Sequence, residues 1–393
     1  MSGPAVPVGV VPPERALRSV LTSAAAALGV PGCENALGVP ASRRVVVALV
    51  DGLGRSVLKR FGGHAPTLRA AMADGGRVLQ AAVPTTTAAS LTSLGTGLDV
   101  GEHGVAGYDV LDPERDAVVN QLGGWDEATD PVAWQPRATV FERAGAAGVD
   151  AVTVSLPAFE HSGLTRAGLR GGRFVAGRGL LARAQAAERV LKDAREPTLV
   201  YFYVNELDKA GHRDGVGSDR WLHALEEIDG ALRRLVDRVP AGTVVLATGD
   251  HGMVDVPPTR RVDYAAADES GALADPALLE GIAHTAGEPR LVQLHFRPDA
   301  DADVRARVRR AWEDRFGAHV WVLTRDEAVA AGWFGTVVEE RVRGRIGELL
   351  VAVHGDLALY DGRRVAPHAF EMVGQHGSPT RAEREVPLLT WRR

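Results

Sequence analysis

The sequence predicts an α/β fold with a mainly parallel sheet, helices on both faces and a small inserted α+β subdomain. Short apolar, β-branched runs alternate with longer segments of helical periodicity as far as residue 253, which favours parallel strands joined by helices. Several of the apolar runs end in Asp, His or Gly, most clearly in 243–253, TVVLATGDHGM. The alternation stops between about residues 256 and 344. These three observations predict an α/β core with polar residues at its strand ends, interrupted by an insertion.

The elements of the core follow in order along the chain. The proline-spaced start up to Pro13 predicts an extended arm. Apolar spacing of three and four predicts helices at about 14–29, 66–73, 88–94, 139–147, 180–194 and 221–239. Dense β-formers predict strands at 43–50, 77–83, 151–156, 198–204 and 244–247.

The insertion has a different texture, rich in Pro, Asp and Ala turns. It contains two predicted strands, 291–296 and 320–323, and a charged helix, 303–316. Segments 347–353 and 357–360 resemble paired strands that return to the main domain, and a last strand is predicted at 386–391. We therefore expect a core of residues 1–255 and 345–393, with an inserted α+β cap subdomain at 256–344.

Composition excludes several classes of function. The chain has 393 residues, a formal net charge of -5 and no block of like charges, which argues against a nucleic-acid-binding surface. The single cysteine, Cys33, can form neither an intrachain disulfide nor a cysteine-type zinc site. No apolar run approaches the roughly 20 residues of a membrane span, and no secretory-type leader is evident. We expect a cytoplasmic protein without a membrane segment, in an oligomeric state that the sequence leaves open.

Residues that can bind metal ions stand at four places, three of them after predicted strands and one in a glycine-flanked loop. Parallel strands place their carboxyl ends at one edge of a sheet, which is where α/β proteins bind ligands. The candidates are Asp51, Asp208, His212, Asp250, His251 and His376. An isolated Asp-His pair after a strand is often only a turn with a capping carboxylate, so the set carries more weight than any one pair.

Three aspartates and three histidines divide naturally into two sites with three ligands each. Three protein ligands leave an open position, as in catalytic zinc sites. Two such ions about 3.5–4 Å apart can hold the attacking and leaving oxygens of a displacement at phosphorus. The ligand types suit zinc first, with manganese or iron as alternatives.

A nucleophile can come from the segment Pro84-Thr85-Thr86-Thr87, which precedes the helix at 88–94. A threonine there has an ordinary explanation as an N-cap. The same place directs backbone N–H groups and the positive helix end towards a bound phosphate. Both roles are compatible.

Five motifs stand in order along the chain: VDGLG, PTTTAASLTSLGTG with GEHG, ELDKAGH, TGDHGM and QHGS. In this order they resemble the alkaline phosphatase superfamily, and within it the type I phosphodiesterase / nucleotide pyrophosphatase family. The resemblance covers about 43–253 and the tail from 347, and it leaves the insertion unassigned. It implies an alkaline-phosphatase-like core.

The resemblance also implies roles for the candidate residues. One metal would be held by Asp208, His212 and His376, and the other by Asp51, Asp250 and His251. The last threonine of the family's P-[ST]-x-T-like segment falls on Thr87, with Thr86 as the alternative. Attack by Thr87 on phosphorus would give a covalent threonine intermediate, and water would then hydrolyse it. The substrate would be a small phosphate ester or pyrophosphate, nucleotide-like in character.

Departures from the family pattern leave other functions open. An Asn that contacts phosphate in many members is missing from the segment after His103, where Tyr108 could donate instead. His161 lies in a loop where it could contact substrate. No sulfatase signature is present, and no Arg is placed for a monoesterase. The alternatives are a phosphonate or phosphomonoester hydrolase of the same superfamily, or a catalytically silent metal-binding regulatory module.

Overall fold

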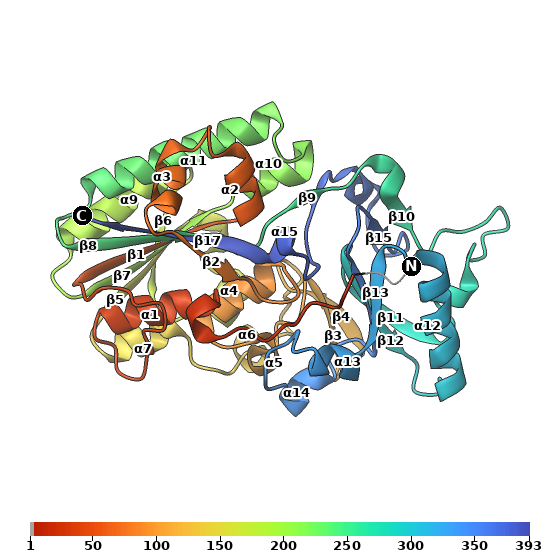
Figure 1. Cartoon of the computed structure of the whole chain (residues 1–393). Coiled ribbons are helices and arrows are strands. Elements are labelled where there is room, and N and C mark those ends of the chain that lie inside the picture. The colour runs from red at the N-terminus through yellow and green to blue at the C-terminus, as the bar shows by residue number, and fades with distance from the viewer. Residues whose placement is uncertain (1–3) are drawn as a thin grey trace.

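The larger sheet has seven strands in the order β2-β17-β8-β1-β7-β5-β6 (Figure 1). The structure, a computed structural model, describes residues 4–393. The strands of this sheet are β1 (Arg44–Val50), β2 (Arg77–Gln80), β5 (Asp150–Ser155), β6 (Arg173–Ala176), β7 (Thr198–Val204), β8 (Thr243–Thr248) and β17 (Glu385–Arg392). Only β17 runs antiparallel to its neighbours among these strands. The predicted parallel α/β core is confirmed.

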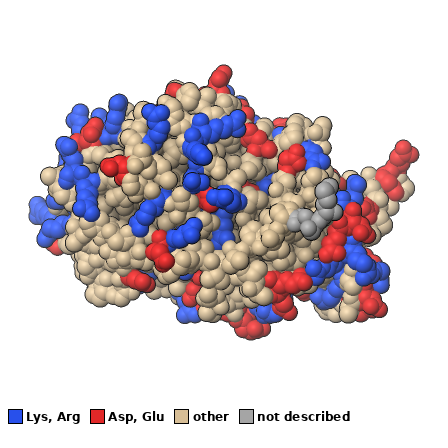
Figure 2. Space-filling view, viewed as in Figure 1, with Lys and Arg blue, Asp and Glu red and all other residues tan. Residues whose placement is uncertain are grey.

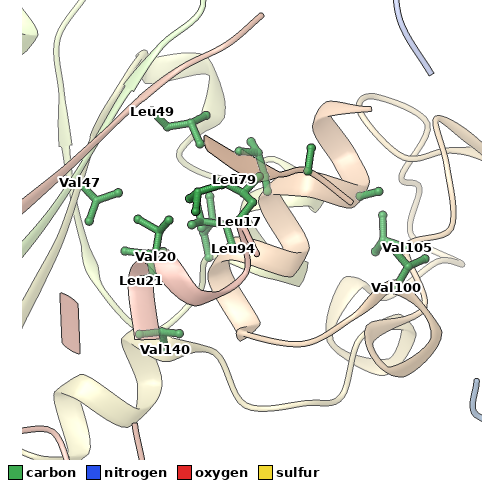
Figure 3. Packing of buried hydrophobic residues seen from close by; sticks show 14 of the residues in the cluster. Leu17, Val20, Leu21, Val47, Leu49, Leu79, Leu94, Val100, Val105 and Val140 are labelled. Atoms are coloured by element: carbon green, nitrogen blue, oxygen red, sulfur yellow. The ribbon is translucent and has the colours of Figure 1, made fainter. Parts of the chain in front are cut away.

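Helices cover both faces of this sheet, because its central strands bury side chains on both sides. One face packs against α1 (Ser19–Ala27), α4 (Thr87–Thr96), α7 (Val140–Ala146) and α8 (Gly163–Gly168). The other packs against α2 (Arg55–Phe61), α3 (Pro66–Ala73), α9 (Leu180–Asp193), α10 (Glu206–Asp214) and α11 (Asp219–Arg238). Figure 3 shows Val47 and Leu49 of β1 facing Leu17, Val20 and Leu21 on the first face.

A smaller sheet of six strands lies at the other end of the molecule, in the order β13-β14-β12-β11-β3-β4 (Figure 1). Its strands are β3 (Asp109–Asp112), β4 (Ala117–Asn120), β11 (Ile282–Glu288), β12 (Leu291–Phe296), β13 (Val320–Thr324) and β14 (Leu349–Val353). The helix α12 (Ala302–Phe316) covers one face through buried Val308, Trp312 and Phe316. This α+β unit takes β11, β12, β13 and α12 from residues 256–344 and β3, β4 and β14 from outside that range.

The expected return of 347–353 and 357–360 to the main sheet as a strand pair is wrong. β14 pairs with β12 and β13 of the smaller sheet, and β15 (Ala358–Tyr360) pairs in parallel with β10 (Arg261–Asp263). The hairpin of β3 and β4 also joins the smaller sheet, through Gly287 opposite Asp109. Local periodicity identifies a strand but carries no information about its partner. The division of the chain at 255 and 345 stays a prediction, and these pairings argue for counting β14 with the smaller sheet.

An extended N-terminal arm connects the two sheets, as the spaced prolines predict (Figure 1). The indole N–H groups of Trp321 and Trp333, on the side of the smaller sheet, donate to the carbonyls of Pro4 and Pro7 at 2.7 and 2.9 Å. The guanidinium of Arg384, just before β17, donates to the carbonyl of Val8 at 2.7 Å. The arm thus forms hydrogen bonds to both parts of the molecule and helps to hold the two sheets in their relative positions.

The remaining elements are short. They are α5 (Val100–His103), α6 (Pro131–Trp134), α13 (Arg325–Ala330), α14 (Glu340–Arg343), α15 (Arg381–Arg384), β9 (Val254–Asp255) and β16 (Gly374–Gln375), with 3-10 turns at Pro13–Arg15, Pro157–Phe159, Pro258–Arg260, Pro276–Leu278 and Pro367–Glu371. Within residues 4–393, none of the helices combines the length and the apolar character that a bilayer crossing requires. Basic and acidic side chains are interspersed on the face shown in Figure 2.

Candidate active site and metal centre

The predicted ligands converge at the carboxyl edge of the larger sheet. β8, β1 and β7 are neighbours in that sheet and run parallel. Asp51 follows β1, the pair Asp250 and His251 follows β8, and Asp208 lies beyond β7. Because three adjacent parallel strands end at the same edge of the sheet, the loops that follow them lie side by side and bring these aspartates and the histidine together.

Asp208 and His212 lie on α10, a helix that the sequence analysis did not predict. Residues four apart share one helix face, and here Asp208 Oδ1 lies 3.3 Å from His212 Nε2. The helix packs close to the loop after β1: a Cβ on Gly52 would come within 3.2 Å of the Asp208 Cα. Gly52 also has a φ of 76°, so the conformation favours glycine there, and the space beside it is tight.

Hydrogen bonds to backbone carbonyls orient all three histidines. His212 Nδ1 lies 2.7 Å from the Gly374 carbonyl, His251 Nδ1 3.0 Å from the Gly252 carbonyl, and His376 Nδ1 2.8 Å from the Thr85 carbonyl. A carbonyl can only accept, so each Nδ1 carries the proton. Each Nε2 therefore presents a lone pair, as a metal-binding imidazole requires.

The first group consists of Asp208, His212 and His376. The two histidine Nε2 atoms lie 3.2 Å apart, and Asp208 Oδ1 lies 3.9 Å from His376 Nε2. The candidate ligand atoms of this group lie within 4.8 Å of one another. The spacing fits three ligands around one ion.

The second group consists of Asp51, Asp250 and His251, all buried. His251 Nε2 lies 3.4 Å from Asp51 Oδ1 and 3.5 Å from Asp250 Oδ2. The candidate ligand atoms again lie within 4.8 Å of one another. The structure brings the six predicted residues together in the two groups expected.

The carboxylates of both groups lack the partners that buried charges need. Asp208 Oδ1 and Asp250 Oδ2, the oxygens nearest the histidine nitrogens, form no hydrogen bond within the described chain. Burial, reinforced by the Asp250 charge, raises the pKa of Asp51 to about 8. Burial also raises the pKa values of Asp208 and Asp250 to about 7. Divalent ions would supply the positive charge that these oxygens lack, so the donor set fits the two metals that the family implies.

Thr87 is the hydroxyl that lies beside these groups. Its Oγ1 is 3.2 Å from His251 Nε2 and 3.5 Å from Asp51 Oδ1. It is the first residue of α4, so the helix N-terminus adds positive potential at this point. The Thr86 hydroxyl forms no hydrogen bond to either ligand group within residues 4–393. This geometry favours Thr87 over Thr86 as the nucleophile.

Two cavities meet at Thr87 and Asp208. The sheet-side cavity, of about 220 Å³, is lined mainly by apolar and aromatic side chains, among them Phe159, Leu164 and Tyr201. It extends from the candidate nucleophile along the face of β5 and β7. Its apolar walls can shield a bound group from water.

The cap-side cavity, of about 340 Å³, lies between Thr87 and the smaller sheet. Polar residues contribute more to its lining, including Glu288, Arg364 and the predicted contact Tyr108. The Tyr108 side chain is 39% exposed, so it is free to meet a ligand. His161 is exposed and is not part of the described lining of either cavity, although Phe159 and Ser162 beside it line the first.

Sequence reasoning missed Tyr203, whose hydroxyl donates to Asp51 Oδ2. The signal was present in β7, TLVYFYV, where Tyr201 and Tyr203 alternate and so share one face of the sheet. The last of them reaches the edge at which Asp51 lies. Tyr201 points its hydroxyl into the same region, where it has no hydrogen-bond partner among the described residues.

Replacing Tyr203 by phenylalanine is expected to lower zinc affinity roughly 10-fold, because hydrogen bonds to ligating carboxylates hold them in place. The matched control is Tyr201→Phe, which removes a hydroxyl without a partner and should leave zinc affinity unchanged. Zinc titration against a chromophoric chelator measures both variants. Equal losses in the two would contradict a specific role for the Tyr203 hydroxyl.

Comparison with known proteins assigns the chain to a family. The sequence model of the type I phosphodiesterase / nucleotide pyrophosphatase family matches residues 45–379. That span is most of the chain and includes the six ligand-type residues and Thr87. The protein belongs to this family, within the alkaline phosphatase superfamily.

Solved structures share the fold at low sequence identity. Murine ectonucleotide pyrophosphatase / phosphodiesterase 5, as an inactive variant in complex with AMP, superposes with a TM-score of 0.64 at 14% identity, covering 88% of this chain and 87% of that one. Phosphonoacetate hydrolase from Sinorhizobium meliloti 1021, in complex with phosphonoformate, gives a TM-score of 0.64 at 17% identity and covers 89% and 90%.

Among curated proteins, a relative matches over a short segment. The 2,3-bisphosphoglycerate-independent phosphoglycerate mutase of Metallosphaera sedula is 39% identical over 71 residues. The match covers 18% of this chain and only 16% of the length of that relative. It therefore says nothing about the activity of the whole chain, whereas family membership supports phosphoester hydrolysis.

Proposed function

We propose that this protein is a two-metal hydrolase of phosphodiester or pyrophosphate bonds that acts through a covalent intermediate on Thr87. The observation that carries the proposal is the position of the Thr87 hydroxyl, beside a ligand group and at the junction of two cavities. Zinc is the ion proposed first, and manganese or iron would suit the same aspartate and histidine donors. The family's name and the AMP bound by the murine neighbour support nucleotide-like substrates.

The chain's own residues would perform the steps as follows. Asp51, Asp250 and His251 would hold one ion and Asp208, His212 and His376 the other. Bound metals supply positive charge to the phosphate oxygens and favour the ionised form of a nearby hydroxyl. The Thr87 oxygen would form a bond to phosphorus as the bond to the leaving oxygen breaks; the hydroxyl proton would pass to solvent, and the leaving oxygen would take up a proton from solvent. Water would then attack phosphorus, so that its oxygen stays on the released phosphate while the threonine–phosphorus bond breaks and one proton restores the Thr87 hydroxyl.

The two cavities support a diester rather than a monoester substrate. A phosphate at Thr87 can carry one substituent into the sheet-side cavity and another into the cap-side cavity. A monoester has a single substituent and would use only one of them. The second cavity has more charged side chains in its lining than the first, so the two cavities suit unlike groups.

The zinc-loaded protein is expected to hydrolyse bis-p-nitrophenyl phosphate with a kcat/KM at least about 10-fold above that for p-nitrophenyl phosphate. Release of p-nitrophenol measures both reactions, and Asp250→Asn is the control for contaminating phosphatases. A reversed preference would identify a phosphomonoesterase.

Two further outcomes separate the remaining alternatives. Release of phosphate from phosphonoacetate, without diester turnover, would identify a phosphonate hydrolase. Absence of turnover with all of these compounds, while two ions per chain stay bound, would identify a metal-binding module without catalysis.

A further inference from the structure

We propose that Arg290 and Glu383 are a positioning pair through which the smaller sheet holds the His376 loop in its metal-binding geometry. The proposal rests on the two-metal site proposed above. It concerns residues outside the ligand groups, one from each of the two parts of the molecule. Both side chains are buried, at 1% and 0% exposure.

Arg290 lies in the turn between β11 and β12 and uses all of its donors. Its Nε and one Nη donate to the two carboxylate oxygens of Glu383 at 2.7 and 2.9 Å. The other N–H groups donate to the carbonyls of Gly355, Leu357 and Val353 at 3.0, 2.9 and 3.3 Å. A guanidinium has five N–H groups in a fixed plane, so this site is built for arginine and cannot be satisfied by lysine.

Glu383, held in place by Arg290, in turn binds the loop that carries His376. Its Oε1 accepts from the backbone N–H of Ser378 at 3.1 Å, and its Oε2 accepts from the hydroxyl of Thr380. The carboxylate therefore receives two hydrogen bonds from Arg290 and two from the loop. No oxygen of Glu383 is left for another partner.

The same loop is joined to the segment that carries the candidate nucleophile. Gly377 and Thr85 exchange hydrogen bonds of 3.0 Å, the Thr85 hydroxyl donates to the Ser378 carbonyl at 2.9 Å, and His376 Nδ1 donates to the Thr85 carbonyl. Displacement of Ser378 would therefore move His376. Asp51 and Asp250 would be affected less, because neither carboxylate hydrogen-bonds to this loop within the described chain. His251 is nearer, since its ring stacks on that of His376 at 3.6 Å between centroids, but the Gly252 carbonyl holds its Nδ1 independently of the loop.

A stabilising role alone does not explain the pair. Replacing a buried ion pair by apolar side chains of similar size is often neutral or stabilising. What such a replacement cannot reproduce is the two hydrogen bonds from Ser378 and Thr380 to a carboxylate that Arg290 holds in place. The pair should therefore matter more for the ligand geometry than for the free energy of unfolding.

The test measures bound zinc in the full-length protein, at free zinc concentrations set by a chelator buffer. We expect about two ions per wild-type chain. Arg290→Met and Glu383→Gln should each hold close to one, because affinity at the Asp208, His212 and His376 site falls at least about 10-fold. Arg290→Lys should behave like Arg290→Met. The absorption spectrum of the cobalt-loaded protein reports on ligand geometry independently of activity.

The double variant Arg290→Met with Glu383→Met separates positioning from stability. It leaves no buried charge unpaired, so its midpoint of thermal unfolding should recover above that of Arg290→Met, while bound zinc stays near one per chain. Arg234→Met is the control, since it breaks the 3.0 Å pair with buried Glu188 between α11 and α9, away from both ligand groups. It should keep two ions.

Three results would overturn the inference: two ions with unchanged affinity in the Arg290 and Glu383 variants, parallel loss from both sites, or recovery of zinc together with stability in the double variant. A variant that fails to fold counts against the pair as a positioning device if the double variant folds and holds two ions. A wild-type chain that binds fewer than two ions would instead reject the proposed function.

Discussion

Replacing Thr87 by alanine is expected to lower turnover of bis-p-nitrophenyl phosphate by about 10³-fold or more, with two metal ions per chain retained. The Thr87 oxygen lies 3.2 Å from His251 Nε2 and 3.5 Å from Asp51 Oδ1, where an ionised hydroxyl can face phosphorus. The substitution removes the atom that forms the new bond but none of the metal ligands. Steady-state kinetics and metal analysis of one preparation check both parts.

Two variants test the identity of the nucleophile. Thr87→Ser keeps a hydroxyl at the same place and should retain turnover far above that of Thr87→Ala. Thr86→Ala removes a hydroxyl that has no hydrogen bond to either ligand group within residues 4–393, and it should have a smaller effect. Loss in Thr86→Ala together with normal turnover in Thr87→Ala would transfer the role to Thr86, and normal turnover in both would exclude a threonine intermediate here.

The ligand groups could be predicted because each aspartate stands at the end of a recognisable strand or just beyond it. Asp51 and Asp250 directly follow apolar runs, and parallel strands end at a common edge. Knowledge of the strand order β8-β1-β7 is not needed to predict that these aspartates lie at one edge of the sheet. His376 follows only the short strand β16, so its glycine-flanked loop is the weakest of these signals, and the family resemblance alone implies which metal it would hold.

The pairing of the smaller sheet could not be predicted, because strand pairing there depends on residues far apart in the chain. β3 lies about 175 residues before its partner β11, where Gly287 faces Asp109. The helix α10 was missed for a local reason. It begins with a polar Glu-Leu-Asp-Lys segment, contains Gly211 and has only three buried residues, Leu207, Ala210 and Gly211, which is too short an apolar pattern to indicate a helix.

Residues that support the ligands were harder to find than the ligands. Tyr203 acts through one hydrogen bond to Asp51, and Glu383 through two hydrogen bonds from the His376 loop. A Tyr within a strand or a Glu before one has an ordinary structural explanation, and only the folded geometry shows its partner. The alternation of Tyr201 and Tyr203 was the one sequence signal that pointed to such a role.

Removal of metal is expected to make stability strongly dependent on pH. Burial and mutual repulsion raise the pKa of Asp51 to about 8, and burial raises the pKa values of Asp208 and Asp250 to about 7, whereas an unfolded Asp has a pKa of about 3.9. Between these values the folded state binds more protons than the unfolded state. The free energy of unfolding of the metal-free protein should therefore fall as the pH rises from about 4 to about 8.

Zinc should reverse this trend, because it binds the ionised carboxylates and binds them better as protons leave. The gain in the midpoint of thermal unfolding on adding zinc to chelator-treated protein should thus be larger at pH 8 than at pH 5. Hydrolysis should disappear on chelation and return with zinc. Parallel thermal scans with and without zinc, at four or five pH values, measure the difference.

Asp51→Asn gives the sharpest form of this prediction, because it removes one buried charge while keeping the shape of the side chain. Without metal, the variant should be more stable than the wild type at pH 8 and close to it at pH 4. With metal, it should hold less zinc and lose most of its turnover. A variant less stable than the metal-free wild type at pH 8 would show that the Asp51 carboxylate is already neutralised by its protein contacts, and it would remove the electrostatic argument for a metal in that group.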